Sequence, residues 1–178
     1  FVPWLTEGPM TERDAVSAPR CVVFSVADHR LALPGEAVRK VLAMPRLETV
    51  PAMPPVLQGV MVVGGAAVPV LRLDVLFGLP RREPGIYTPL LLLDRPDGPL
   101  ALMADAVLAV AAVSPRDLAP LDPAASFNRC VRATWTAGGA TVHLLDPQAL
   151  LSAAEEARLE ELRAIAAQRL SAWQGAPP

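Results

Sequence analysis

The chain has 178 residues, of which 52% are hydrophobic and 19% charged, and its net charge at pH 7 is −2. This much apolar sequence excludes a disordered chain and can build a core without disulfides or metals. The charges are nearly balanced and interleaved, without the basic stripe that nucleic-acid binding requires, so no nucleic-acid partner is predicted.

The N-terminal residues 1–19 mix proline, glycine and charge without a period and predict a loose arm. They lack the pattern of a secretory signal, and no apolar run reaches the ~20 residues of a membrane span. A reduced, cytoplasmic protein without direct membrane insertion is therefore expected. Cys21 and Cys130 lie in apolar runs and are interpreted as buried small hydrophobes. The chain does not begin with Met, so a longer natural chain is one interpretation.

In chain order, four connections between apolar runs predict four β-hairpins. They are residues 27–29, Gly64-Gly65, residues 95–98 and Gly138-Gly139. Paired glycines supply the positive φ that tight hairpin turns require. This regular spacing of strands and turns favours an all-β barrel or sandwich. Several of the strands are apolar at successive positions, which indicates that both of their faces are covered. Pro69 inside a strand predicts an edge or a bulge. Only residues 35–42, GEAVRKVL, show a brief helical pattern in this part.

The last segment predicts a long helix from Pro147 to Trp173, with Asp146 as its N-cap. Its apolar residues recur every three or four positions, which defines one helical face. The residues of that stripe are Leu159, Leu162, Ala166, Leu170 and Trp173. We expect the stripe to pack on the protein's own barrel rather than on a partner.

One phrase of sequence occurs twice. When Gly138-Gly139 is laid on Gly64-Gly65, the following apolar strands match, and Asp146 falls on Arg72. Two copies of a hairpin turn, a strand and a short helix indicate two similar barrels in one chain. Asp74, two residues after Arg72, is a candidate cap for the short helix.

The sequence offers little for catalysis. His29 and His143 have no cysteine or carboxylate at metal-ligand spacing, and no known catalytic motif is present. Four carboxylates, Asp94, Asp97, Asp105 and Asp146, could in principle pair as acid and base, but each is better explained by a turn or by the end of an element. We therefore predict no enzyme, no metal and no cofactor, and expect a protein that works by binding other proteins.

Four segments, taken in order, resemble the CheW-like domain family of bacterial chemosensory systems. They are CVVFSVADHRLALPGEAVRKVL, PAMPPVLQGVMVVGGAAVPVLRLDVLFGLP, ALMADAVLAV and HLLDPQALL. The family's pattern is met by Pro51, Pro54, Gly59, Gly65, Pro69, Val70, Leu73, Gly78-Leu79, Asp105 and Val107, with Ala101 in place of a glycine. The resemblance covers most of the chain.

This resemblance implies a mainly β fold of two intertwined five-stranded SH3-like barrels with short helices, over residues 20–152. A C-terminal α-helix and tail follow over residues 153–178. It also implies a non-catalytic adaptor, which couples chemoreceptors to a CheA-type histidine kinase by binding the receptor tip and the kinase's regulatory domain. The implied receptor-type groove comprises Val38, Lys40, Val62, Gly64, Met103 and Val107. The implied kinase-type edge comprises Gly65, Ala66, Ala67 and Val68.

The sequence departs from the family pattern at three positions. Lys40 replaces a glutamate, Gly64 replaces an arginine, and Arg72 replaces an aspartate. The glutamate and arginine could face each other across neighbouring strands as an ion pair. Either these changes are drift in a tolerant surface, or they mark a coupling protein with a different partner.

Two other functions stay open at this point. One is a CheW-like domain that belongs to a larger kinase or to a receiver-linked adaptor. The other is a ligand-binding barrel, although the interior of a small barrel is usually filled by its own side chains.

Overall fold

The computed structural model describes residues 18–49, 51–122, 124, 126 and 129–174. The chain forms two compact units, and each is built from two separate stretches of sequence. Of the described residues, unit 1 contains those up to Val38 together with those of Asp105–Leu150, and unit 2 contains those of Arg39–Ala104 and those from Leu151 onward. The chain therefore enters unit 2, returns to unit 1 and enters unit 2 again, which makes the two units intertwined in sequence.

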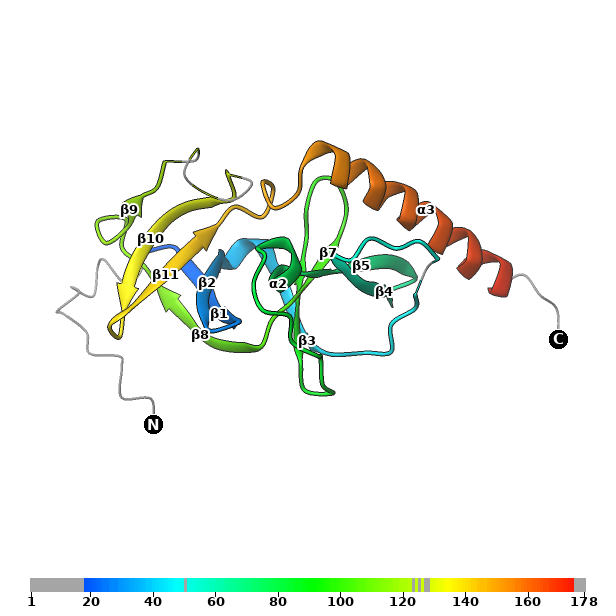
Figure 1. Ribbon diagram of the computed structural model, residues 1–178, viewed down its shortest axis with the longest axis horizontal. Helices are drawn as coiled ribbons and strands as arrows, with labels where there is room; N and C mark the ends of the chain where they lie inside the picture. The colour runs from blue at the N-terminus through cyan, green and yellow to red at the C-terminus, as the bar shows by residue number, and fades with distance from the viewer. Residues whose placement is uncertain (1–17, 50, 123, 125, 127–128, 175–178) are drawn as a thin grey trace. The chain divides into compact units, whose positions relative to one another are not determined.

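Unit 1 holds a six-stranded sheet in the order β8-β1-β2-β11-β10-β9 (Figure 1). Its strands are β1 (Arg20–Val26), β2 (His29–Pro34), β8 (Ala106–Ala112), β9 (Ala119–Pro120), β10 (Val131–Ala137) and β11 (Ala140–Leu145). The 3-10 helix η1 (Gly35–Ala37) follows β2. Strands β2 and β11 run parallel, while the other pairs are antiparallel. One core cluster of this unit consists of Cys21, Val23, Ala32, Val113, Trp135 and Val142.

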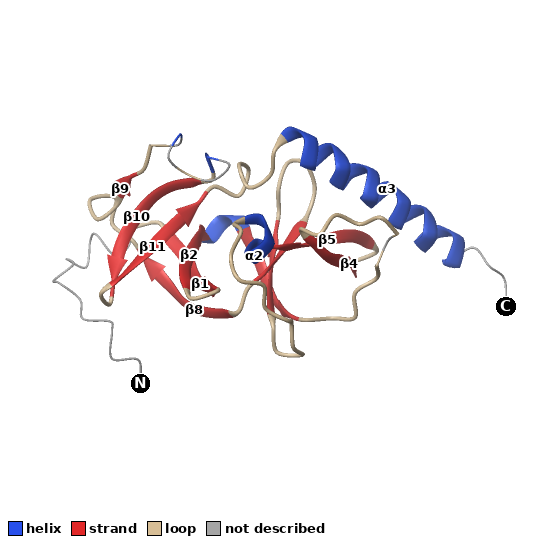
Figure 2. Cartoon of the chain, viewed as in Figure 1, coloured by secondary structure: helices blue, strands red, loops and turns tan. Residues whose placement is uncertain are grey.

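Unit 2 holds a five-stranded sheet in the order β3-β6-β7-β5-β4. Its strands are β3 (Val38–Ala43), β4 (Leu57–Val63), β5 (Ala66–Arg72), β6 (Pro89–Leu93) and β7 (Leu100–Met103). The short helix α2 (Leu73–Leu76) follows β5, and the long helix α3 (Ala153–Gln174) ends the described chain (Figure 2). One core cluster of this unit consists of Met61, Val68, Val70, Leu90, Leu92, Ala101 and Met103. The predicted fold class, mainly β with a C-terminal helix, is confirmed.

Each unit is made of two hairpins whose second strands lie side by side in parallel. In unit 1 these strands are β2 and β11, and in unit 2 they are β5 and β7. The repeated phrase of the sequence supplies β11 in one unit and β5 in the other. Its glycines have φ of +57° and +82° at Gly64 and Gly65, and of +56° and +74° at Gly138 and Gly139. The repeat thus encodes a tight turn and the central strand that follows it.

Three predictions about local structure are wrong. Residues 38–42 form most of strand β3 instead of continuing a helix, because Val38 and Val41 are β-branched and pairing in the sheet decides the conformation. His29 begins β2 instead of lying in the turn, which consists of Ala27 and Asp28 with φ of +45° and +68°. The long helix begins at Ala153 instead of Pro147.

The start of α3 is fixed by a capping box. The Ser152 backbone N–H and hydroxyl both donate to Glu155 Oε2 at 2.7 Å, and the Glu155 N–H donates to Ser152 Oγ at 3.4 Å. Asp146 instead accepts the N–H of Gln148 at 3.0 Å in an earlier turn. Leu159, Leu162 and Ala166 are buried, as the stripe predicted. The side chain of Trp173 and the arm over residues 1–17 lie outside the described residues.

Candidate functional site

The hairpin turn between β4 and β5 presents an uncharged surface to solvent. Gly64, Gly65 and Ala66 are exposed, and Val62 is 48% exposed. We call these four residues the glycine-turn surface. A Cβ added at Gly64 or Gly65 would meet no atom within 4 Å, so the glycines are needed for their positive φ and not for lack of space. The surface therefore joins two residues of each predicted set, from the receptor-type groove and from the kinase-type edge.

The rest of the kinase-type set lies beneath the surface. Ala67 is only 9% exposed and Val68 is buried in the core of unit 2. The strand that carries them, β5, lies between β4 and β7 and is not an edge strand of the sheet. Its pairing with β7 is confined to Val70–Arg72, however, so Pro69 needs no N–H for that neighbour. This half-paired side of β5 explains how a central strand accommodates a proline.

The receptor-type residues do not share one element or one environment. Lys40 is exposed on β3, whereas Met103 is buried on β7. Val38 and Val107 belong to unit 1 and are half-buried. The proposed ion-pair geometry at positions 40 and 64 is wrong, because β3 and β4 are not hydrogen-bonded neighbours in the sheet of unit 2.

Arg72 is completely buried, which sequence reasoning missed. Its Nε and Nη2 donate to the two carboxylate oxygens of Asp74 at 3.1 and 2.6 Å. Its Nη1 donates to Gln58 Oε1 at 2.7 Å, and Nη2 also donates to the carbonyl of Arg82 at 2.6 Å. A fork that meets both carboxylate oxygens is the strongest geometry for this pair. Arg72 is therefore a structural residue, and its interpretation as surface drift is wrong.

Asp74 is the anionic half of this network and not the N-cap of α2, a position that Arg72 occupies. It accepts the backbone N–H of Val75 at 2.8 Å and of Arg82 at 3.1 Å. Burial would raise the pKa of Asp74, but the hydrogen bonds from Arg72, Arg82 and Val75 and the charge of Arg72 outweigh it and lower the pKa. The carboxylate is thus ionised and fully engaged, which is unlike a catalytic acid or base.

The cysteines and His143 also lack the environment of a catalytic group. Cys21 and Cys130 are buried and form no disulfide, and burial raises the pKa of Cys130 to about 11, so its thiol stays protonated. Burial, with a smaller contribution from the charge of His29, lowers the pKa of His143. Among the described residues no group of three His, Cys, Asp or Glu side chains is placed to hold a metal ion. Nor does any described helix combine the length and apolarity needed to cross a membrane.

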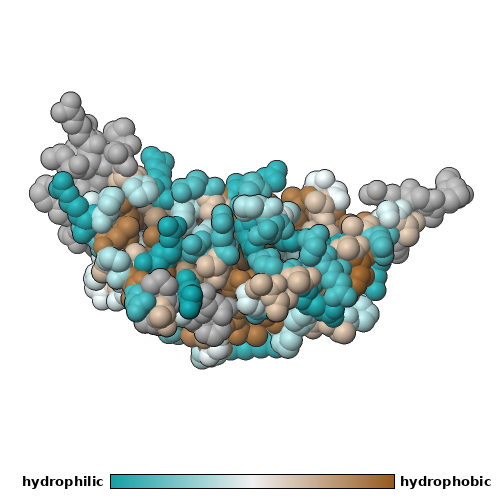
Figure 3. Space-filling view, turned by 90° about the horizontal axis from the view of Figure 1, so that it is seen from above, coloured by the Kyte–Doolittle hydropathy of each residue, from teal (hydrophilic) through white to brown (hydrophobic). Residues whose placement is uncertain are grey.

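The described surface seen in Figure 3 is mostly hydrophilic, with apolar residues in small separate patches.

The fold defines a class of small double β-barrel domain with exposed strand and turn surfaces. Within that class, the sequence matches the family model of the CheW-like domain over residues 20–155, and the chain belongs to this family. Almost all of α3 lies beyond the matched range. No curated protein matches the chain.

One similar solved structure is the crystal structure of scaffolding protein TtCheW from Thermoanaerobacter tengcongensis. It is 20% identical, with a TM-score of 0.69, and the match covers 83% of this chain and 92% of the other. At this identity the likeness supports the fold that the family match defines.

Proposed function

We propose that this protein is a cytoplasmic signalling adaptor that couples chemoreceptors to a CheA-type histidine kinase. It acts by holding two partners and not by catalysis. The observation that carries this proposal is the family match over residues 20–155, which spans hairpins of both units and includes the glycine turn.

The glycine-turn surface supports contact with the regulatory domain of the kinase. Its residues are exposed and uncharged, and the turn has the backbone geometry of a two-residue hairpin connection. The first half of β5 beside it lacks a β7 partner, which suits a partner that approaches the strand from that side. Ala66 is the residue of β5 that tests this contact, because Ala67 is buried.

The receptor would be bound through the exposed members of the other set. Lys40 and Val62 are exposed, while buried Met103 contributes to the shape of unit 2 and not to direct contact. A cation at Lys40 favours a receptor tip with an acidic or apolar counterpart.

Titration calorimetry with the purified regulatory domain of the kinase from the source cell tests the proposal. We expect a Kd on the order of 1 μM, or about −8 kcal/mol. Ala66→Asp places a charge in the apolar contact and should weaken binding roughly tenfold, a loss of about 1.4 kcal/mol. The matched control is Ala164→Asp on the exposed side of α3, which should bind like the wild type. Absence of binding by the wild-type chain would overturn the proposal.

A further inference from the structure

The loop before β6 ends in a turn that carries two large apolar side chains in solvent. Ile86 is 75% exposed and Tyr87 is 88% exposed. The Gly85 N–H donates to Thr88 Oγ1 at 2.8 Å, and the Thr88 N–H donates to the Gly85 carbonyl at 3.1 Å. We call residues 85–88 the tyrosine turn. Tyrosine is among the residues that most often anchor protein interfaces, so a closed turn that exposes one is a candidate contact point.

The loop that leads to this turn is anchored in the core of unit 2. The buried Arg72–Asp74 pair holds both backbone groups of Arg82, since Arg72 Nη2 donates to the Arg82 carbonyl and the Arg82 N–H donates to Asp74 Oδ2. The chain is thus fixed three positions before the tyrosine turn begins. Such anchoring lowers the entropy that binding must overcome, which favours recognition by a shaped protein pocket.

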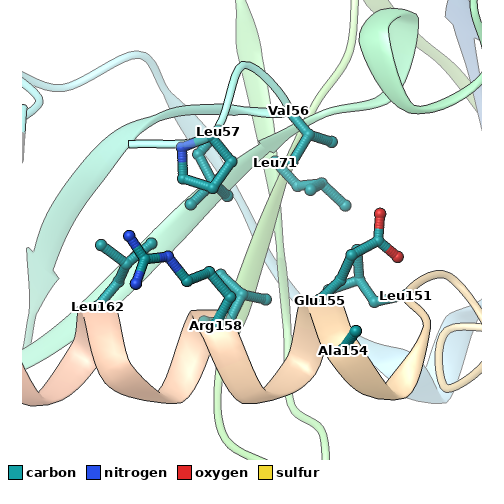
Figure 4. Close-up of a pocket in the computed structure, with 10 residues that line it drawn as sticks. Val56, Leu57, Leu71, Leu151, Ala154, Glu155, Arg158 and Leu162 are labelled. Carbon is teal, nitrogen blue, oxygen red and sulfur yellow. The ribbon is translucent and has the colours of Figure 1, made fainter. Parts of the chain in front are cut away.

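Unit 2 also carries an apolar pocket of a suitable size. The pocket lies between α3 and strands β4 and β5 and has a volume of about 190 Å³ (Figure 4). Its walls include Leu57, Leu71, Leu151, Leu159 and Leu162. An apolar cavity of roughly 150 Å³ is known to hold benzene, so a tyrosine ring fits this volume.

The pocket also offers a polar partner for a phenol. Glu155 lines it and extends from α3 toward the strands (Figure 4). Buried tyrosine hydroxyls usually find a hydrogen-bond partner, and a carboxylate is a strong acceptor. A ring that enters the pocket can therefore donate its hydroxyl to Glu155.

The charges around the turn and the pocket are complementary. Arg81 and Arg82 are exposed just before the tyrosine turn, with Glu83 as the one acid beside them. The part of α3 that borders the pocket, residues 153–163, carries four glutamates and two arginines. Opposite net charges on two surfaces favour their encounter and fix their orientation.

Turn and pocket do not meet within one chain. The tyrosine turn precedes β6, whereas α3 is bound to the loop that follows β6, where Arg163 donates to the carbonyls of Asp97 and Pro99 at 2.7 and 2.9 Å. The tyrosine turn thus lies at the start of β6, the Arg163 contact of α3 lies beyond its end, and no residue of the turn lines the pocket. We propose that Tyr87 of one copy inserts into the α3 pocket of a second copy. Each copy then carries one anchor and one pocket, a head-to-tail contact.

Sedimentation velocity at increasing protein concentration tests this self-association. We expect the wild type to associate reversibly and Tyr87→Ala to do so roughly thirtyfold more weakly, as for an interface hot spot. Val41→Ala, which truncates another exposed apolar side chain of unit 2, is the matched control and should associate like the wild type. A wild type that stays monomeric throughout, or a Tyr87→Ala variant that associates equally well, would overturn the proposal.

A mixing experiment tests the direction of the contact. Ala154→Trp fills the pocket from its exposed rim, so this variant keeps its anchor and loses its pocket. Alone, this variant and Tyr87→Ala should each associate much more weakly than the wild type, whereas their mixture should form a one-to-one complex through the one intact anchor and the one intact pocket. If Ala154→Trp does not fold, the variant Arg81→Glu on the exposed loop is tested instead. We expect it to associate more weakly than the wild type, and we expect high salt to have no further effect on its association. A mixture that remains monomeric, or an Arg81→Glu variant that associates normally, contradicts the head-to-tail geometry.

Discussion

At the scale of single residues, we expect the largest loss of stability from breaking the buried pair of Arg72 and Asp74. Arg72→Met removes the cation and leaves the Asp74 carboxylate buried with only backbone N–H partners. Losing one member of a buried pair typically costs about 3–5 kcal/mol. We therefore expect the free energy of unfolding, measured by urea denaturation, to fall by about that amount.

The repeated phrase supplies the control. Asp146, the counterpart of Arg72 in the second copy, lies 3.9 Å from Arg132; the Arg132 side chain is exposed and that of Asp146 is partly exposed. A surface pair of this kind contributes about 0–1 kcal/mol, so Arg132→Met should change little. Equal losses from the two variants would mean that burial does not distinguish the pairs.

His143 should make the stability of unit 1 sensitive to mild acid. Burial and the charge of His29 lower the pKa of His143 in the folded state, so the unfolded chain binds the proton more readily. Stability is then fully present above the ordinary histidine pKa of about 6.5 and decreases as pH falls through the folded-state value. Melting temperatures taken from neutral pH downward should fall below about pH 6.5, and His143→Gln should reduce this slope. A slope unchanged in His143→Gln would assign the effect to other groups.

At the scale of elements, α3 is held to unit 2 by polar contacts as well as by its leucines. Arg163 binds two carbonyls of the loop that follows β6, and Glu156 forms an ion pair with buried Arg95. Gly98 allows this close approach, because a Cβ there would lie 3.3 Å from the Arg163 guanidinium. The helix residues of these contacts, Glu156 and Arg163, lie outside the range that matches the family model. The contacts make α3 an integral part of unit 2.

Removing the guanidinium of Arg163 should loosen this helix. A hydrogen bond from a charged group contributes about 1.5–3 kcal/mol, so Arg163→Met should raise amide hydrogen exchange over residues 153–170. Arg169→Met removes an exposed cation from the same helix and should leave exchange unchanged. Wild-type exchange rates in Arg163→Met would show that the leucines alone hold the helix.

Local chemistry explains which elements could be predicted from the sequence. The glycine turns were predictable because positive φ at two successive positions is a property of those residues themselves. The start of α3 is ambiguous in the sequence, because Asp146-Pro147 is a valid capping signal, but the helix is capped by the Ser152–Glu155 box six residues later. The sequence of β3 has a helical pattern, but a short segment of mixed character takes the conformation that its neighbours in the sheet impose.

The burial of Arg72 could not be predicted from its own surroundings in the sequence. Its partners include Gln58 and the carbonyl of Arg82, which only the folded chain brings together. The repeat did mark the position, since it set an arginine against Asp146, but sequence alone could not show whether that arginine faced water or the core. The exposed Tyr87 was missed for a similar reason, because an apolar residue in a proline- and glycine-rich loop carries no sign of its exposure.

At the scale of the whole molecule, the two units depend on each other through the course of the chain. Each unit needs two separate stretches of sequence, so neither can be produced as a continuous fragment. An adaptor built in this way presents surfaces from both units on one polypeptide. Its choice of partners can then change through exposed residues while the two cores are preserved.

Lys40 is the position at which we expect such a change of partner. It is exposed on the edge strand β3, where a charge affects partner choice far more than stability. A typical receptor tip is adapted to the glutamate that the family pattern has at this position. The cation of Lys40 should therefore be repelled by like charge on that tip, or find no attraction there. Lys40→Glu should therefore bind a typical family receptor tip at least roughly tenfold more tightly than the wild type, a difference of about 1.4 kcal/mol.

Gly64→Arg completes the reversal and has a separate cost. Arginine meets no atom at this position, but φ of +57° strains any residue with a Cβ, by roughly 1 kcal/mol. The double variant should thus bind the typical tip best and melt slightly lower than Lys40→Glu, while binding to the cognate tip decreases. Binding to both tips can be measured by calorimetry, with melting curves as the check on folding. If all versions bind the two tips equally, the departures from the family pattern at positions 40 and 64 are drift in a tolerant surface. Other residues of the chain then determine which receptor is bound.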